Sequence, residues 1–139
     1  MEAKEFLGLD VGEKRIGVAR ASALAMLAEP LTTIAAEGGL DKLKEMVAER
    51  GVGALVVGLP RNLSGDDTAQ TTTVRDWVAR AKQAIEKPFF WQDEALTSIA
   101  AAKLQATNSK FQTKDIDALA AAILLQDFLD APESQRVLC

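Results

Sequence analysis

The sequence predicts an α/β protein in which helices cover a mixed β-sheet. Three strand-like segments come first along the chain, and the later strand-like segments are separated by helical ones. Strands joined by short turns pair antiparallel, whereas strands separated by a helix can pair parallel, so the order β, β, β, α, β, α, β, α, α indicates both kinds of pairing. At 139 residues the chain has the length of a single domain, over residues 1–139.

The first third of the chain contains the three consecutive strands. Residues 6–10 and 16–21 are apolar segments joined by the turn-rich GEKR, a spacing that favours an antiparallel hairpin. The β-branched segment PLTTI, residues 30–34, is the third expected strand. Apolar residues then recur at helical spacing from Leu40, and this helix is expected to end at Arg50, just before a glycine.

The rest of the chain alternates between strands and helices. ALVVG, residues 54–58, is a continuous apolar run typical of a strand buried on both faces, and the loop LPRNLSGDDT follows it. The patterns beyond it predict, in order, a helix over 74–85, a strand over 89–91 that leads into Gln92, Asp93 and Glu94, a helix over 97–106, and a final helix over 116–128. Residues 131–139 show no pattern, so we expect a frayed tail there.

Composition excludes several classes of enzyme. The chain has no histidine and no tyrosine, and its single cysteine is Cys139, so histidine-based triads and histidine- or cysteine-ligated zinc are ruled out. The net charge of −4 argues against a broad basic face for nonspecific nucleic-acid binding. No apolar run approaches the ~20 residues that span a bilayer, and the start does not resemble a signal peptide, so the expected location is the cytoplasm. Catalysis would fall to carboxylates or a lysine.

Acidic residues interrupt apolar structure at three places. Asp10 ends the first strand, Asp93 and Glu94 close the last strand, and Asp115 and Asp117 open the final helix. Each has a structural explanation, because a turn aspartate bonds its own backbone and an acid near a helix start is favourable against the helix dipole. Taken together, they could gather at one sheet edge, where clustered carboxylates favour Mg²⁺ or Mn²⁺. Two such ions about 4 Å apart are how nucleases activate water and stabilise the leaving oxygen.

Basic residues flank these acids in the sequence, and two interpretations of them stay open. They are ordinary solvated surface residues, or they bind a nucleic acid locally despite the acidic overall balance. The set comprises Lys14, Arg15 and Arg20 after Asp10, Arg61 in the loop after the buried strand, and Lys103, Lys110 and Lys114 before the final helix.

Five motifs occur together in a familiar order: LGLDVGEKRIGVA, EPLTTI, VVGLPRNLSG, DEALTS and DIDALAAAILLQDFL. In this order and spacing the chain, from about Phe6 to Asp130, resembles the YqgF family, also called RuvX, within the ribonuclease-H-like superfamily. The resemblance implies a five-stranded mixed sheet with helices on both faces and a divalent-metal phosphodiesterase. It maps the catalytic and metal-binding acids onto Asp10, Glu94 and Asp117, with Asp93 adjacent. Family members are associated with maturation of the 5′ end of precursor 16S ribosomal RNA, and some are described as cutting branched DNA.

The sequence departs from this family's pattern at two places. Ala95 stands where the family usually has an arginine after the Asp-Glu pair, and residues 20–22 read Arg-Ala-Ser where it often has Ser-Asp. Loss of an arginine beside the acids would weaken the grip on substrate more than on metal. The LPRNLSG loop stays close to the pattern, with Arg61, Asn62 and Ser64 as candidate phosphate contacts.

Three hypotheses of function follow. The leading one is a nuclease that uses Mg²⁺ or Mn²⁺ to process precursor 16S ribosomal RNA in the cytoplasm. The second is a Holliday junction resolvase, which would need two active sites and therefore a dimer. The third is a noncatalytic nucleic-acid-binding protein on the same fold. No hypothesis involves a membrane.

Overall fold

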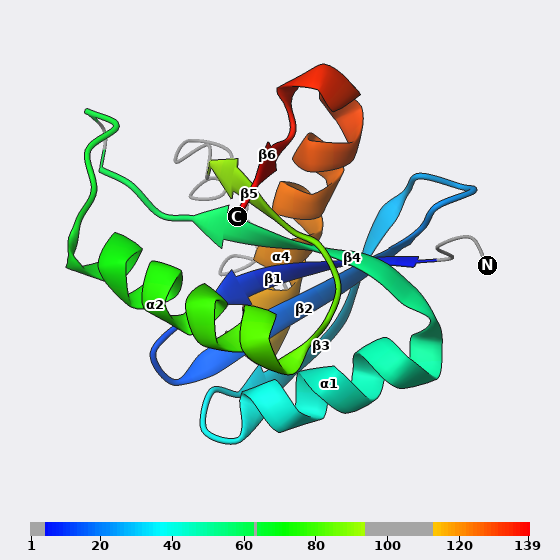
Figure 1. Ribbon diagram of the computed structural model, residues 1–139, viewed down its shortest axis with the longest axis horizontal. Helices are drawn as coiled ribbons and strands as arrows, with labels where there is room; N and C mark the ends of the chain where they lie inside the picture. Colours follow the sequence, from blue (N-terminus) through cyan, green and yellow to red (C-terminus); the bar gives the residue numbers. More distant parts are fainter. Residues whose placement is uncertain (1–4, 63, 94–112) are drawn as a thin grey trace.

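The structure contains a mixed six-stranded sheet with helices on both faces (Figure 1). The computed structural model describes residues 5–62, 64–93 and 113–139, the last range with side chains from 116 onward. The strands are β1 (Glu5–Val11), β2 (Arg15–Ser22), β3 (Ala28–Ala35), β4 (Val52–Leu59), β5 (Phe89–Asp93) and β6 (Val137–Leu138). The helices are α1 (Gly39–Arg50), α2 (Ala69–Ala84) and α4 (Thr113–Asp130), with a short 3-10 helix, η1, at Glu133–Gln135. The expected helix over 97–106 lies outside the described residues.

The strands are ordered β3-β2-β1-β4-β5-β6 across the sheet. β1, β2 and β3 form an antiparallel meander, and β6 is antiparallel to β5. β1 pairs parallel with β4, and β4 pairs parallel with β5. The parallel strands β1, β4 and β5 therefore end on one side of the sheet, which we name the carboxyl edge. The predicted fold class is confirmed, with β6 added to the five expected strands.

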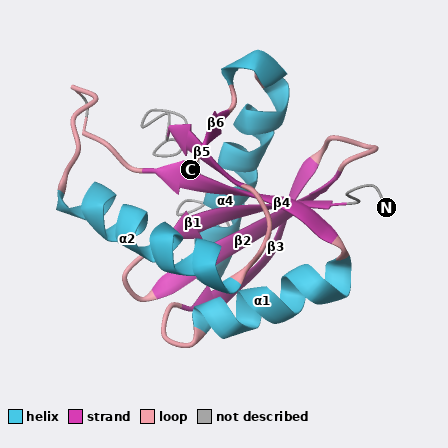
Figure 2. Ribbon diagram, in the orientation of Figure 1, coloured by secondary structure: helices cyan, strands magenta, loops and turns pink. Residues whose placement is uncertain are grey.

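Each face of the sheet has its own core, and strand alternation decides which residue enters which core. α1 and α2 cover one face and α4 covers the other (Figure 2). In β1, Leu7 and Leu9 are fully buried beneath α1 and α2, whereas Phe6 packs into the core beneath α4. Asp10 follows the parity of Phe6, so it projects to the α4 face near the carboxyl edge.

α4 approaches the sheet unusually closely because glycines face it. A Cβ built on Gly8 would lie 2.7 Å from Cβ of Leu125, and one built on Gly17 would lie 2.0 Å from the carbonyl oxygen of Asp117. The helix contributes small residues such as Ala121 to the same contact. β1 and β2 therefore fix both the height of α4 above the sheet and its position along it. Among the described helices, α4 included, none has the length and apolar character needed to cross a membrane.

α2 begins at Ala69, five residues before the expected start. Thr68 and Thr71 form a capping box: the Thr71 amide donates to Thr68 Oγ1 at 3.4 Å, and the Thr68 amide donates to Thr71 Oγ1 at 2.9 Å. The Thr71 hydroxyl also donates to the Pro60 carbonyl, which ties the helix start to the end of β4. These polar bonds extend the helix beyond its amphipathic pattern.

The end of the chain differs from its expected frayed state. Residues 131–139 contain η1 and β6, and β6 pairs with β5. The Cys139 amide donates to the Phe89 carbonyl at 2.9 Å, and Lys82 Nζ donates to the Cys139 carbonyl at 2.8 Å. A strand of two residues is too short to leave a periodic pattern in sequence, which is why the prediction of a frayed tail was wrong.

Candidate functional site

The packing of α4 brings Asp10 and Asp117 to the same place. Asp10 lies opposite Gly17 in the β1–β2 ladder, and directly paired residues project to the same face of a sheet. That face is covered by α4, where the Asp117 backbone lies so close to Gly17 that a side chain would not fit between them. Two predicted acids from opposite ends of the chain therefore meet near the carboxyl edge, although sequence alone places them far apart.

Arg15 forms an ion pair with one of these acids. Arg15 Nε donates to Asp117 Oδ2 at 2.8 Å, which connects the start of β2 to the start of α4. The side chains are 47% and 21% exposed, respectively, so the pair adds at most about 1 kcal/mol to stability. Its main consequences are to orient the Asp117 carboxylate and to balance its charge. The structure thus links a predicted nucleic-acid contact to a predicted catalytic acid.

The end of β5 divides its two acids between described and undescribed residues. Glu94 lies outside the described residues, so its position relative to Asp10 stays a prediction. Asp93 is described, and it shares the parity of Trp91, which packs into the core beneath α1 and α2. The Asp93 carboxylate is 3.7 Å from Arg61 Nη1 and mostly exposed. The structure does not bring Asp93 to the face that holds Asp10.

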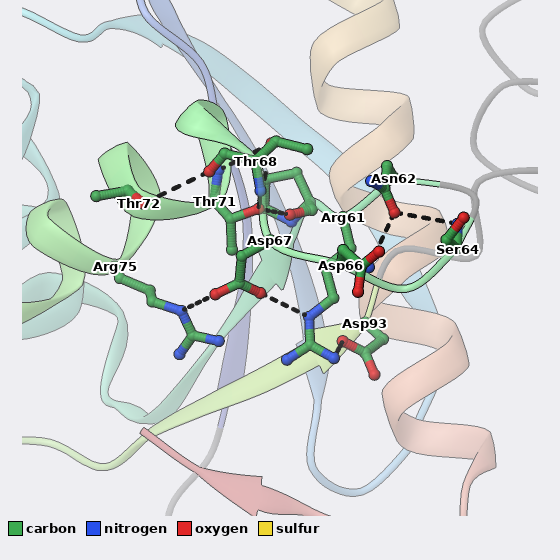
Figure 3. Close-up of polar contacts among 11 residues, drawn as sticks. Arg61, Asn62, Ser64, Asp66, Asp67, Thr68, Thr71, Thr72, Arg75 and Asp93 are labelled. Carbon is green, nitrogen blue, oxygen red and sulfur yellow. Dashed lines mark hydrogen bonds and ion pairs between the residues drawn. The ribbon is translucent and has the colours of Figure 1, made fainter.

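The loop between β4 and α2 is shaped by its own side chains (Figure 3). Asn62 Oδ1 accepts hydrogen bonds from the amides of Ser64, at 3.0 Å, and Asp66, at 2.9 Å. These two bonds engage the Asn62 oxygen in folding the turn. The Ser64 side chain is exposed at the surface. Arg61 points toward Asp67, with Nε and Oδ1 3.4 Å apart. Of the predicted phosphate contacts here, Asn62 has a structural role in the loop and Arg61 is held by acids.

Arg20 lies away from this site, although it is close to Asp10 in sequence. It pairs in register with Leu7, three residues before Asp10 in β1, and shares the parity of Val18, which is buried beneath α1 and α2. There it forms ion pairs with Glu29 and with Glu5, 2.9 Å away. The hydrogen bonds to Glu29 and Glu5 raise the pKa of Arg20. Arg20 therefore stays charged, and its guanidinium group is paired with these two carboxylates.

The remaining predicted cations are divided in the same way. Lys14 is exposed in the turn between β1 and β2, beside Arg15. Lys110 lies outside the described residues, as does the side chain of Lys114. Around Asp10, the described basic residues of the predicted set are therefore Lys14 and Arg15.

The two acids at the carboxyl edge fit a hard divalent cation in their chemistry. Carboxylate oxygens are the ligands that Mg²⁺ and Mn²⁺ prefer, and both Asp10 and Asp117 come from rigid elements. Over residues 5–62, 64–93 and 116–139, no group of three or more His, Cys, Asp or Glu side chains could hold a metal ion. The family resemblance assigns a third carboxylate to Glu94, which lies outside the described residues.

A known protein family matches nearly the whole length of this chain. A sequence model of the RuvX family, described as "Holliday junction resolvase", matches residues 4–131. The chain belongs to the RuvX family. Relatives of this RuvX chain include three proteins that carry the name "Putative pre-16S rRNA nuclease". They come from Roseiflexus sp. (strain RS-1), 40% identical over 94% of this chain and 96% of its own, from Chloroflexus aggregans, 41% identical over 94% and 96%, and from Thermoanaerobacter pseudethanolicus, 35% identical over 93% and 98%.

Solved structures agree with the RuvX assignment at the level of the fold. The structure titled "T. thermophilus RuvC in complex with Holliday junction substrate" has a TM-score of 0.61 and 16% identity, and the match covers 97% of this chain and 99% of that one. A second structure of RuvC from Thermus thermophilus gives a TM-score of 0.59 with 15% identity. The ribonuclease-H-like fold implied by the family resemblance is confirmed.

The sequence patterns of this RuvX chain did not single out Arg75 and Asp67, which pair with each other beside the loop between β4 and α2. Arg75 Nε lies 3.4 Å from Asp67 Oδ2, and Asp67 Oδ1 faces Arg61 (Figure 3). Arg75 belongs to the polar face of an amphipathic helix, where a basic residue is ordinarily solvated. The sequence does hold one indication of this position. Arg75 comes two helical turns after the loop 59–68, and long side chains on a helix point back toward its N-terminus, here toward that loop.

Proposed function

We propose that this RuvX protein is a divalent-metal-dependent nuclease that processes the 5′ end of precursor 16S ribosomal RNA in the cytoplasm. The observation that carries the proposal is the meeting of Asp10 and Asp117 on the α4 face of the carboxyl edge. The names of the three relatives supply the substrate class. The absence of histidine from the chain agrees with chemistry that depends on carboxylates and metal.

In this mechanism Asp10, Asp117 and Glu94 would hold Mg²⁺ or Mn²⁺, with two ions expected. When bound, the metal supplies Lewis acidity that activates water and stabilises charge on the leaving oxygen. The chain's own residues set the geometry: Gly17 allows the start of α4 to reach β2, and Arg15 fixes the rotamer of Asp117 by donating from Nε at 2.8 Å. The exposed portion of Arg15 and the neighbouring Lys14 provide positive charge toward a substrate phosphate.

The direct test is the substitution Asp10→Asn, which keeps the size of the side chain and removes its charge. We expect cleavage of a labelled 5′ fragment of precursor 16S ribosomal RNA to fall at least ~100-fold in Mg²⁺ or Mn²⁺, because an amide is a much poorer ligand for a hard cation. The matched control is Asp76→Asn, at an exposed position on α2. Equal cleavage by both variants would refute the mechanism.

A second candidate is favoured by the description of the family model as a Holliday junction resolvase. The same acids would then cut a four-way DNA junction, and symmetric cutting would require a dimer. The same assay with a labelled junction in parallel separates the two: RNA cleavage supports the processing role, and cleavage of the junction alone supports the resolvase. If folded protein binds either substrate but cuts neither, a noncatalytic binding role replaces both.

A further inference from the structure

A cleft of about 470 Å³ lies beside the carboxyl edge, and two of its lining residues, Trp91 and Asp93, are on the face of the sheet opposite Asp10. Its walls come from the ends of β4 and β5, from the start of α2 and from the C-terminal segment. The lining residues that matter here are Arg61, Arg75, Trp91, Asp93 and Gln135. Because Asp93 ends β5, a polymer that reaches the carboxyl edge can continue into this cleft.

Two arginines of the cleft are held side by side by one carboxylate. Asp67 Oδ1 is 3.4 Å from Arg61 Nε, and Asp67 Oδ2 is 3.4 Å from Arg75 Nε. Figure 3 shows the Nε atoms of both arginines directed toward the Asp67 carboxylate, with the terminal nitrogens of both guanidinium groups directed away from it. Asp67 is therefore a positioning residue, which spaces two forks of N–H donors at the surface of the cleft.

The acids around these arginines leave much of their hydrogen-bonding capacity unused. The Nε atoms of Arg61 and Arg75 are buried, yet within the described residues neither has a hydrogen-bond partner of normal geometry. The distance from Arg61 to Asp93 is longer still, at 3.7 Å, with the Asp93 side chain 70% exposed. Ion pairs as long and exposed as these are weak, whereas an arginine bound to phosphate makes short, charge-assisted bonds. Because both Nε atoms are buried while the two side chains remain partly exposed, an incoming phosphate would bond to the terminal nitrogens of the guanidinium groups.

Trp91 indicates which part of a nucleic acid would enter. A base would need an open aromatic face for stacking, but Arg75 already lies over the Trp91 ring, 5.6 Å from its centroid. The ring instead supports the guanidinium from below. The cleft therefore offers guanidinium N–H donors, which suit the phosphodiester backbone rather than a base.

We propose that Arg61 and Arg75 bind a backbone phosphate of the nucleic-acid strand, outside the set of acids that carries out hydrolysis. The identity of the polymer rests on the proposed nuclease function, but the phosphate site rests on the cleft itself. The contact would hold a strand that crosses from the α4 face of the carboxyl edge to the α2 side. Arg75 thereby becomes a substrate-binding residue beside the already predicted Arg61.

The test measures binding without cleavage, by fluorescence anisotropy of a labelled single-stranded RNA in EDTA over a series of salt concentrations. The test variant is Arg61→Gln combined with Arg75→Gln. The control combines Arg80→Gln with Lys87→Gln, which removes the same charge at exposed positions. We expect the test variant to bind at least ~10-fold more weakly than the control, with its salt slope reduced by about 0.7 for one lost phosphate of a single strand.

Each outcome decides the matter. Equal affinity and salt slope in the two double variants would overturn the phosphate site. Inorganic phosphate that binds as tightly as the RNA would overturn it too, because the cleft would then be a small-anion site. If a thermal melt shows that the double glutamine variant is not folded at the temperature of the binding assay, the variant Arg61→Lys with Arg75→Lys decides instead. That pair keeps the charge but loses the fork, so at least ~3-fold weaker binding is expected and unchanged binding refutes the proposal.

Failure of the nuclease proposal would be recognised separately. Loss of RNA binding in the cleft variant, together with no RNA cleavage by wild-type protein, would retain the phosphate site and reject the nuclease. Cleavage that depends on Asp10, together with no difference between the two double variants, would do the reverse.

Discussion

The substitution Gly17→Ala tests whether close packing of α4 positions the acids of the proposed active site. The added Cβ would lie 2.0 Å from the Asp117 carbonyl oxygen and 2.3 Å from its carbonyl carbon, whereas ordinary contacts begin at 3.4 Å. The start of α4 must therefore withdraw by about 1.4 Å, because both atoms belong to backbone and cannot rotate away. Overpacking of this kind costs about 1–3 kcal/mol. A displacement of ~1 Å at a catalytic group can lower a rate ~100-fold, so cleavage should fall further than stability alone explains.

Urea unfolding and RNA cleavage are measured together on this variant and on Gly39→Ala. The second substitution adds the same methyl group at a buried glycine, where the nearest atom is the flexible Ile16 Cδ1 at 3.0 Å. We expect the control to lose less than about 1 kcal/mol and to keep its activity. The reasoning would fail if Gly17→Ala matched this control in both unfolding free energy and cleavage rate.

Further predictions concern Glu5 and Cys139, which lie away from the proposed active site. Glu5 is buried between Arg20 and Arg50, so Glu5→Gln should lower the unfolding free energy by about 1–3 kcal/mol in urea, and an unchanged midpoint would contradict this role. Burial raises the pKa of the Cys139 thiol from 9.0 to about 12, despite Lys82 and Arg75 nearby. The folded protein should therefore react with iodoacetamide at pH 8.5 at least ~10-fold more slowly than the chain in urea. Because the folded-state pKa is raised, this thiol favours the folded state below pH 9, and that contribution is lost as pH rises toward 12.

The sheet was predictable because its strands have local causes. The short GEKR turn determines the β1–β2 hairpin. The continuous apolar run at residues 54–58 is typical of a parallel strand buried on both faces, which is how β4 pairs with β1. β6 was not predictable, because two residues carry no periodicity and the strand is stabilised by its pairing with β5. The early start of α2 follows from hydroxyl bonds of Thr68, which hydrophobic periodicity does not register.

The candidate site was predictable where chemistry is visible in the residues themselves, but not where orientation decides. Asp10 and Asp117 were identified as acids in apolar surroundings, and the fold brings them together. Arg20 was grouped with Asp10 by sequence distance, but β2 carries it back along the sheet and strand parity directs it to the opposite face. Arg75 was missed because its place in the cleft depends on the tertiary fold, which brings its side chain over Trp91 of β5.

The short strand β6 also affects how this protein behaves at high concentration. Both outer strands of the sheet are poor templates for a neighbouring molecule: β3 contains Pro30, and β6 has only two residues. Without β6, the backbone of β5 at Phe90 and Trp91 would lie open to strand addition from another chain. By pairing with β5, β6 therefore protects this edge of the sheet from edge-to-edge aggregation, a contribution to colloidal stability that is separate from catalysis.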